Sequence, residues 1–321
     1  MKIIFSLTLS IIILLFCACG KSEYGSGDGT YNISYEAFDC ETAQNTEDTA
    51  NAGTDGQIIN NRPRYSDGEE IYLNPEWEYA DFSEINTGCA VMYSAKENRN
   101  DIIIAVNAGH GTKGGNAFKT YCHPDKTPKV TGGTTAKGQT QAVAVSSGMT
   151  FNDGEYEANV NLRLAELLRD LLLKNGYDVL MIRNGSDVQL DNIARTVIAN
   201  NIASCHIAIH FDGDSLDYDK GAFYISVPDE IKYLDNVSRI WEESEKLGEC
   251  LISSVKSYGR PIRGNGSSDI DLTQTSFSTV PSVDIEMGNQ CTDHSEASLS
   301  EMASALLDGI NRYFGYQHVS Q

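Results

Sequence analysis

The sequence is poor in basic residues. It has 24 Lys and Arg against 45 Asp and Glu, which gives a formal net charge of −21. Binding to the phosphate backbone requires clustered Lys and Arg, so this balance excludes nucleic acid as a partner. The same charge would be repelled by anionic membrane surfaces, so any attachment to a membrane must be covalent or hydrophobic.

Several short catalytic motifs are also absent. The eight cysteines contain no C-x-x-C pair, and the chain has no H-E-x-x-H and no G-x-S-x-G. None of the six histidines is followed by Glu three residues later. A cysteine-bound zinc cluster, a zincin protease and an α/β-hydrolase are therefore excluded. The connectivity of any disulfide stays open, and Cys205, which lies in an apolar run, is expected to be a core residue.

The N-terminus resembles an export signal. Met1-Lys2 precedes an apolar run, Ile3–Phe16, that is too short to span a bilayer as a helix. The run ends in Phe16-Cys-Ala-Cys-Gly20, which resembles the cleavage box of bacterial lipoproteins. We therefore predict a lipoprotein-type signal peptide over residues 1–19, lipidation of Cys19, and an extracytoplasmic protein anchored to the cell membrane. An ordinary cleaved signal peptide is the alternative.

The next segment is rich in Gly, Ser, Asn, Asp, Thr and Glu and has few large apolar residues. This composition predicts a disordered acidic tether over residues 20–70. Apolar runs at strand or helix spacing begin only around Ile71, so we expect the folded domain to occupy residues 71–321.

Strands and helices alternate along the folded part. The alternation predicts an α/β fold, with a mainly parallel twisted sheet covered by helices on both faces, in a single domain. The clearest helix is 157–175, where leucines recur at three- and four-residue spacing. Further helices are expected at 190–200, 237–258 and 298–314, and strands at 89–93, 102–106, 177–182, 205–210, 221–227 and 280–287.

Residues 113–153 form a long stretch rich in Gly and Thr and interrupted by Pro124 and Pro128. It is too long for an ordinary connector, so it is either a functional loop or a disordered insertion. Its start, Gly109-His-Gly-Thr-Lys-Gly114, matches a dinucleotide fingerprint, but no helix is expected at the third glycine. We therefore expect no nucleotide to bind.

Two histidines, His110 and His210, each follow an apolar strand, and Glu157 begins the helix between those strands. Open α/β sheets place their chemistry at the carboxyl ends of strands. Two histidines and one glutamate with a position left for water are a standard catalytic zinc set, and zinc lowers the pKa of bound water to about 7. Glu286 is the candidate for proton transfer. Glu155 is a competing ligand two residues before Glu157.

These residues lie in four stretches: Val106-Asn-Ala-Gly-His-Gly111, Glu157-Ala-Asn-Val-Asn-Leu162, Ala208-Ile-His210 and Pro281-Ser-Val-Asp-Ile-Glu286. Together they resemble the zinc-dependent N-acetylmuramoyl-L-alanine amidases of the type-3 family. The resemblance covers roughly residues 102–314. It implies hydrolysis of the amide between N-acetylmuramic acid and L-alanine of peptidoglycan.

The resemblance also implies the site residues. One Zn²⁺ per chain would be bound by His110, Glu157 and His210, with Glu286 as the catalytic carboxylate. Glu157 is preferred to Glu155 because Asn161 follows it at the family's spacing.

This chain departs from the family's pattern. Asn107-Ala108 stands where Asp-Pro is usual, and the stretch between the first two ligands is much longer. Asp284 replaces an apolar residue on the face of Glu286, so it either tunes the pKa of Glu286 or acts as a second-shell acid. A non-catalytic peptidoglycan-binding lipoprotein with the amidase fold is the alternative function. All four reactive positions are filled, which argues against it.

Overall fold

The central strand of the sheet, β3 (Ile103–Ala108), is buried along its whole length. The computed structural model describes residues 65–316. The expected signal peptide 1–19, Cys19 and residues 20–64 of the expected tether lie outside this range. The other strands of the sheet are β1 (Glu70–Tyr72), β2 (Cys89–Tyr93), β6 (Asp178–Met181), β7 (Cys205–Asp212), β8 (Ala222–Ser226), β9 (Ile262–Asp269) and β10 (Ser282–Asn289).

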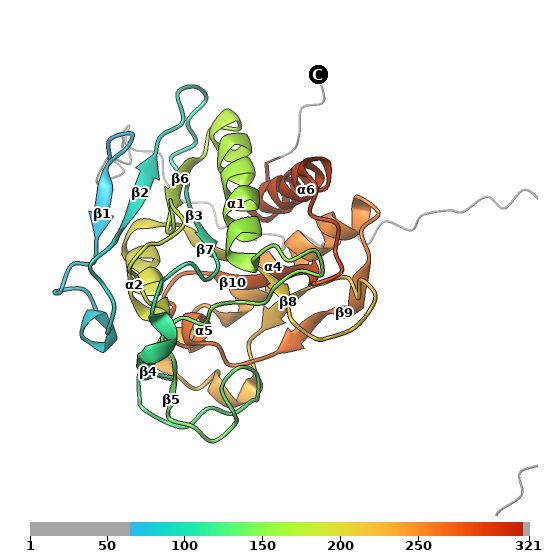
Figure 1. Ribbon diagram of the computed structural model, residues 1–321. Helices are drawn as coiled ribbons and strands as arrows, with labels where there is room; N and C mark the ends of the chain where they lie inside the picture. Colours follow the sequence, from blue (N-terminus) through green and yellow to red (C-terminus); the bar gives the residue numbers. More distant parts are fainter. Residues whose placement is uncertain (1–64, 317–321) are drawn as a thin grey trace, which may run out of the picture. The chain divides into compact units, whose positions relative to one another are not determined.

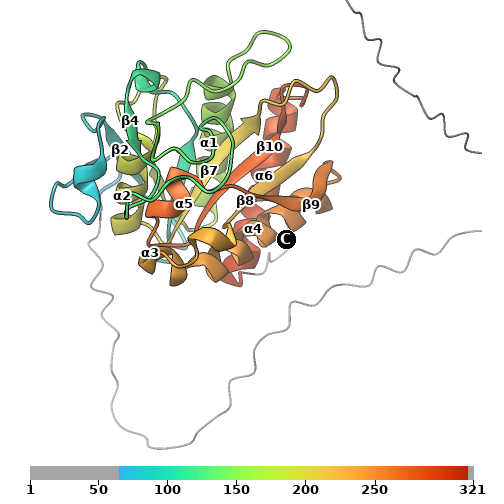
Figure 2. The ribbon, with the colours of Figure 1, turned by 90° about the horizontal axis from the view of Figure 1, so that it is seen from below.

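The eight strands lie in the order β1-β2-β6-β3-β7-β10-β8-β9. The pairs β3–β6, β3–β7, β7–β10 and β8–β9 are parallel, whereas β1–β2, β2–β6 and β8–β10 are antiparallel. Figure 2 shows β7, β10, β8 and β9 side by side. The expected mainly parallel sheet is confirmed.

Helices cover both faces of this sheet. One face packs against α1 (Glu157–Lys174), α4 (Trp241–Ser257) and α6 (Glu296–Phe314), and Figure 1 shows α6 beside α1. The other face packs against α2 (Asn192–Ile202) and the short α5 (Thr273–Phe277), which contacts α2 and the four-residue α3 (Asp235–Ser238). The short 3₁₀ helices are η1 (Ala80–Phe82), η2 (Gly115–Ala117) and η3 (Asp229–Ile231). The single α/β domain expected from the sequence is thus confirmed.

Alternation along the central strands assigns apolar and polar side chains to different faces. Val106, Ile207 and Ile285 belong to the core cluster that includes α1 and α6. On the opposite face, Asn107 of β3, Ala208 of β7 and Asp284 of β10 lie side by side, because Ala208 pairs with both of the others. His210 and Glu286 are the next such pair along β7 and β10. The parallel register therefore brings these polar side chains to one edge of one face.

Two local expectations need correction. The single helix expected over 237–258 is wrong, because α3 and α4 are separate helices and Ile240 between them has a non-helical φ of −130°. Strand β9 was not expected, because Ile262–Asp269 consists mainly of Gly, Asn and Ser and does not alternate in polarity. It forms at the edge of the sheet by parallel pairing with β8, which the local sequence does not encode.

The stretch 113–153 is ordered in the structure. It begins with η2 and then forms a two-stranded ladder of β4 (Lys119–Tyr121) and β5 (Gln141–Val143). Figure 1 shows this ladder beside α5, away from α1. In the described range 65–316, no helix is long and apolar enough to cross a membrane.

The packing of the main core predicts how a substitution there changes the free energy of unfolding. Leu164 of α1 is fully buried in the cluster between α1 and the sheet. Leu164→Ala should lower the free energy of unfolding by about 2–5 kcal/mol, since it removes apolar contacts and leaves a cavity. Urea denaturation followed by circular dichroism measures this change. Ser300→Ala on the exposed side of α6 is the control and should stay within about 0.5 kcal/mol of the parent; equal losses in both variants would contradict the packing described here.

Candidate active site and metal centre

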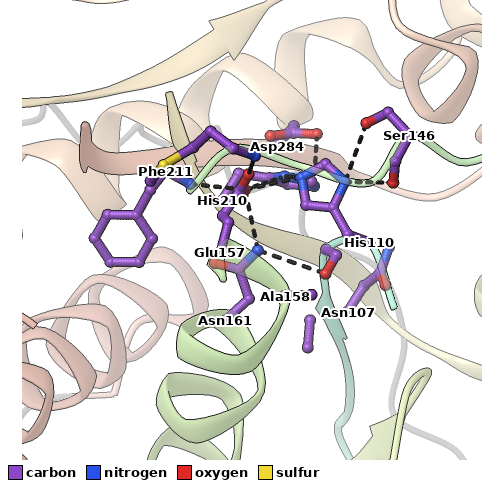
Figure 3. Close-up of polar contacts among 12 residues, drawn as sticks. Asn107, His110, Ser146, Glu157, Ala158, Asn161, His210, Phe211 and Asp284 are labelled. Carbon is purple, nitrogen blue, oxygen red and sulfur yellow. Dashed lines mark hydrogen bonds and ion pairs between the residues drawn. The ribbon is translucent and has the colours of Figure 1, made fainter. Parts of the chain in front are cut away.

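His110, Glu157 and His210 meet at the carboxyl edge of the sheet (Figure 3). Glu157 Oε1 lies 2.9 Å from His110 Nε2 and 3.0 Å from His210 Nδ1. The two imidazole nitrogens are themselves 3.0 Å apart. His110 follows β3, His210 lies near the end of β7, and Glu157 is the first residue of α1. Three segments distant in sequence thus bring one ligand atom each to a common point.

Glu157 is a buried carboxylate with both oxygens engaged. Oε1 accepts hydrogen bonds from Asn161 Nδ2 at 3.1 Å and from the backbone N–H of Phe211 at 3.1 Å. Oε2 accepts from the backbone N–H of Met149 at 2.8 Å. Burial alone would raise the pKa of Glu157, but His110 and His210 lower it well below its ordinary value. The side chain is therefore held as an anion.

The outer nitrogens of the two imidazoles face groups that fix their orientation. His110 Nδ1 lies 2.9 Å from the carbonyl oxygen of Ser146. A carbonyl can only accept, so Nδ1 carries the proton and Nε2 presents a lone pair to the centre. His210 Nε2 faces Asp284 Oδ2 at 3.7 Å, which leaves Nδ1 directed toward Glu157. Burial alone would lower the pKa of His210, but Asp284 and Glu157 raise it to about 10.

Close backbone approach makes this arrangement possible at two glycines. A Cβ on Gly109 would lie 2.1 Å from His210 Cε1, so only glycine lets the strand end pass under the ring. Gly148 has φ +81°, and a Cβ there would lie 2.7 Å from both Glu157 Oε2 and His110 Cδ2. His110 itself adopts the left-handed region with φ 64°, which is uncommon outside glycine and occurs at functional sites.

Asp284 and Glu286 lie on the same face of β10 and line the same cavity as the three converging residues. Asp284 Oδ1 and Glu286 Oε2 are buried atoms without a hydrogen-bond partner among the described residues. Burial raises the pKa of both carboxyl groups, and in Glu286 the neighbouring Asp284 and Glu157 raise it further. A raised pKa brings Glu286 closer to the range in which a carboxyl group can both accept a proton and give it back.

The cavity has a volume of about 670 Å³. One part of its lining comes from the sheet edge and from α2 and α5. The other comes from the 113–153 insertion, which contributes among others Asn116, Lys129, Thr134 and Ser147. The insertion therefore forms a wall of the cavity and also supplies the Ser146 and Met149 backbone contacts to two of the converging residues.

The donor set fits a zinc ion. With Zn–N and Zn–O bonds of about 2.0–2.1 Å, the ligand atoms of a tetrahedral site lie about 3.3 Å apart. The separations of 2.9–3.0 Å among His110 Nε2, His210 Nδ1 and Glu157 Oε1 are close to that value. A polar group lies behind each imidazole: the Ser146 carbonyl behind His110 and the Asp284 carboxylate behind His210. Such a partner on the outer nitrogen is the usual support for a metal-bound histidine.

The structure brings the three expected ligands together and places Glu286 and Asp284 in the same cavity. Glu155, the competing ligand, instead accepts a hydrogen bond from Asn159 Nδ2 at 2.7 Å at the surface. Nothing in the sequence indicates the backbone groups of Ser146 and Met149, because any residue type could supply them. Asn107 also has a role, since its Oδ1 accepts from the buried Arg195 at 3.1 Å.

A family model described as N-acetylmuramoyl-L-alanine amidase matches residues 104–312. The chain belongs to this family. The type-3 amidase resemblance carried by the four sequence stretches is thereby confirmed. A search of curated proteins finds no match.

Solved structures of amidases share the fold. An N-acetylmuramyl-L-alanine amidase from Mycobacterium smegmatis superposes with a TM-score of 0.57 at 18% identity, covering 68% of this chain and 98% of the other. The apo form of the enzyme from Mycobacterium abscessus gives 0.53 at 18% identity, covering 67% and 99%. The common part is thus the catalytic fold of the amidase family.

The contact at Gly148 predicts the effect of a single methyl group. Gly148→Ala should weaken zinc binding at least tenfold, because the new Cβ displaces Glu157 or His110. Competition with a chromophoric chelator measures the affinity. Gly138→Ala is a matched control, since Gly138 lies in the same insertion with φ +88° and no atom within 4 Å of its Cβ. Equal affinities in the two variants would show that Gly148 does not support the ligands.

Proposed function

We propose that this amidase is a zinc-dependent enzyme that hydrolyses the amide between N-acetylmuramic acid and L-alanine in peptidoglycan. His110, Glu157 and His210 would hold one Zn²⁺ per chain, and Glu286 would be the catalytic carboxylate. The observation that carries the proposal is the convergence of three ligand atoms within about 3 Å of one another, in a cavity that Glu286 also lines. Membership of the amidase family supports the substrate.

When bound, zinc would polarise the scissile carbonyl and make the attacking water more acidic. The other tasks fall to the chain. Glu286 takes the proton from the attacking water and delivers it to the nitrogen of L-alanine as the amide bond breaks. Its raised pKa suits this transfer, because it makes the carboxylate a stronger base toward the water and keeps the proton on the group until the amine nitrogen accepts it.

Asp284 supports the reaction indirectly. It faces His210 Nε2, so it stabilises the tautomer in which that nitrogen carries the proton and Nδ1 is free to bind the metal. Its charge also raises the pKa of Glu286. Of the two roles expected for Asp284, the contact with His210 supports the second-shell role and the pKa shift supports the tuning role, so we assign both.

A peptidoglycan-binding lipoprotein without activity remains the competing hypothesis. Such a protein would have no use for an unpartnered carboxylate oxygen in the cavity, because burying a polar atom without a hydrogen bond destabilises the fold. Glu286 Oε2 is such an atom. A catalytic role accounts for it, since the oxygen would find its partner in water or substrate.

The catalytic proposal predicts the effect of one substitution. Glu286→Gln should lower the release of soluble stem peptides from purified peptidoglycan at least a hundredfold, because the amide cannot transfer the proton. Bound zinc should stay near one per chain. Removing zinc with a chelator should abolish release by the parent, and readdition should restore it.

Glu155→Gln is the control, since Glu155 is a surface carboxylate two residues from Glu157. It should retain the activity of the parent. Full activity of Glu286→Gln would instead rule out its assigned role.

We also propose that the protein acts outside the cytoplasm, anchored by a lipid on Cys19 after the signal peptide is cleaved immediately before that residue. Peptidoglycan is an extracytoplasmic substrate, and the N-terminal sequence supports export. Cells fed labelled palmitate should label the parent, and the protein should sediment with membranes. Cys19→Ser should remove the label and release the protein from the membrane, whereas Cys17→Ser should do neither. Retention of label in Cys19→Ser would refute the anchor.

A further inference from the structure

One buried carboxylate, Asp271, which follows β9, fastens residues 123–131 of the insertion to the domain. Asp271 Oδ2 lies 3.0 Å from His123 Nε2 and accepts from the backbone N–H of Val130 at 2.6 Å. Its Oδ1 lies 2.8 Å from Lys129 Nζ and accepts from the backbone N–H of Thr131 at 3.0 Å. Burial alone would raise the pKa of Asp271, but His123, Lys129 and Thr131 hold it far below its ordinary range. We call this set of contacts the Asp271 clamp.

The Asp271 clamp pairs the Lys129 ammonium, so Lys129 is not available to bind a substrate anion. Lys129 lines the cavity, yet its side chain is only 6% exposed and its ammonium is bonded to the carboxylate and the carbonyl oxygen of Asp271. An ammonium neutralised in this way offers little attraction to a second anion.

Arg195, the other Lys or Arg in the described lining of the cavity, is also fully engaged. Its guanidinium donates to the carbonyl oxygens of His110 at 2.6 Å and Leu190 at 3.0 Å, and to Thr112 Oγ1 at 2.9 Å. Because it is buried behind the first ligand, Arg195 supports the backbone of His110 and cannot turn toward a ligand.

Apart from the three converging ligands, the rest of the wall is neutral or acidic. Gly132, Gly133, Thr134 and Thr135 follow the clamp along the insertion and offer uncharged polar groups. Across the cavity, Asp284 and Glu286 each present a carboxyl oxygen that has no hydrogen-bond partner within residues 65–316. A carboxylate on the substrate would therefore meet acidic groups and find no free Lys or Arg among the described lining residues.

We propose that the Asp271 clamp makes this site selective for stem peptides whose residue next to L-alanine carries no free carboxylate, such as peptides in which that carboxyl group is amidated. This inference rests on the proposed amidase function and names the substrate class within it. Beside the Lys and Arg of the described lining, the ion held by the three ligands would supply a positive charge in the cavity. A substrate carboxylate drawn to that ion would compete there with the scissile carbonyl.

The test compares two soluble N-acetylmuramoyl-L-alanyl peptides in which the γ-carboxyl group of the second residue is bonded to a third residue. They differ only in whether the α-carboxyl group of the second residue is amidated (isoglutamine) or free (glutamate). The zinc-loaded parent should show a kcat/KM roughly tenfold higher for the isoglutamine substrate, an effect that decreases with added salt. Equal values for the two substrates would overturn the selectivity and leave the amidase function standing. Cleavage of neither substrate would overturn the amidase function itself, and the inference with it.

Two variants trace the selectivity to the clamp. Asp271→Asn leaves the Lys129 ammonium uncompensated, so the kcat/KM ratio should shift toward the glutamate substrate by about threefold or more. Adding Lys129→Met in the same chain should cancel that shift. A purely structural role for Asp271 would affect both substrates alike and would not be reversed by the second substitution, which would contradict the proposal.

A separate variant keeps the test valid if the clamp variants fail to fold. Thr134→Lys adds a cation to the exposed part of the cavity wall and should also shift the ratio toward the glutamate substrate by about threefold. Ser300→Lys adds the same charge on the exposed side of α6 and is the control. Identical ratios in these two variants would overturn the proposal.

Discussion

The structure depends on keeping one buried carboxylate charged. Taking an ion out of water costs several kcal/mol unless paired groups and hydrogen bonds compensate it. Glu157 meets that requirement with groups from α1, from β7 and from the insertion, and with two imidazoles. The contacts to this one carboxylate help to hold each of these segments in place. A divalent ion would join this network without any of them having to move far, since the ligand atoms already converge.

The sheet supplies the second constraint. In parallel strands, residues paired across β3, β7 and β10 point to the same face, so a polar side chain on one strand has neighbours determined by register. His210 and Glu286 are such a pair, and Asn107 and Asp284 both pair with Ala208. The opposite face of the same strands is apolar and packs on α1. A one-residue slip of β10 would bury both acids in that core and empty the cavity of its carboxylates.

These two constraints explain which parts of the fold and of the site can be predicted from the sequence. The periodicity of α1, the apolar strands before His110 and His210, and the alternation of Asp284 with Glu286 are local signals, and they sufficed for most of the sheet and its helices. For the converging triad they gave candidates, and the resemblance to the amidase family assigned the residues. Strand β9 and the break between α3 and α4 had no such signal. The contacts of Ser146 and Met149 are made by backbone atoms. Asp271 lies 140 residues from Thr131, and nothing in either segment indicates the other.

The insertion shows that the length of a loop does not decide whether the loop is ordered. Apart from Phe151, residues 113–153 contribute little to the main hydrophobic clusters, and polar contacts at several points hold them in place. Two sets of these contacts bear on the site. One is the Asp271 carboxylate, which joins residues 123 to 131. The other is the pair of backbone contacts to His110 and Glu157. A segment that could open freely would have to break the second set and so loosen two of the three converging ligands. The insertion is therefore better understood as a fixed wall, and what it admits is decided by which of its charges remain free.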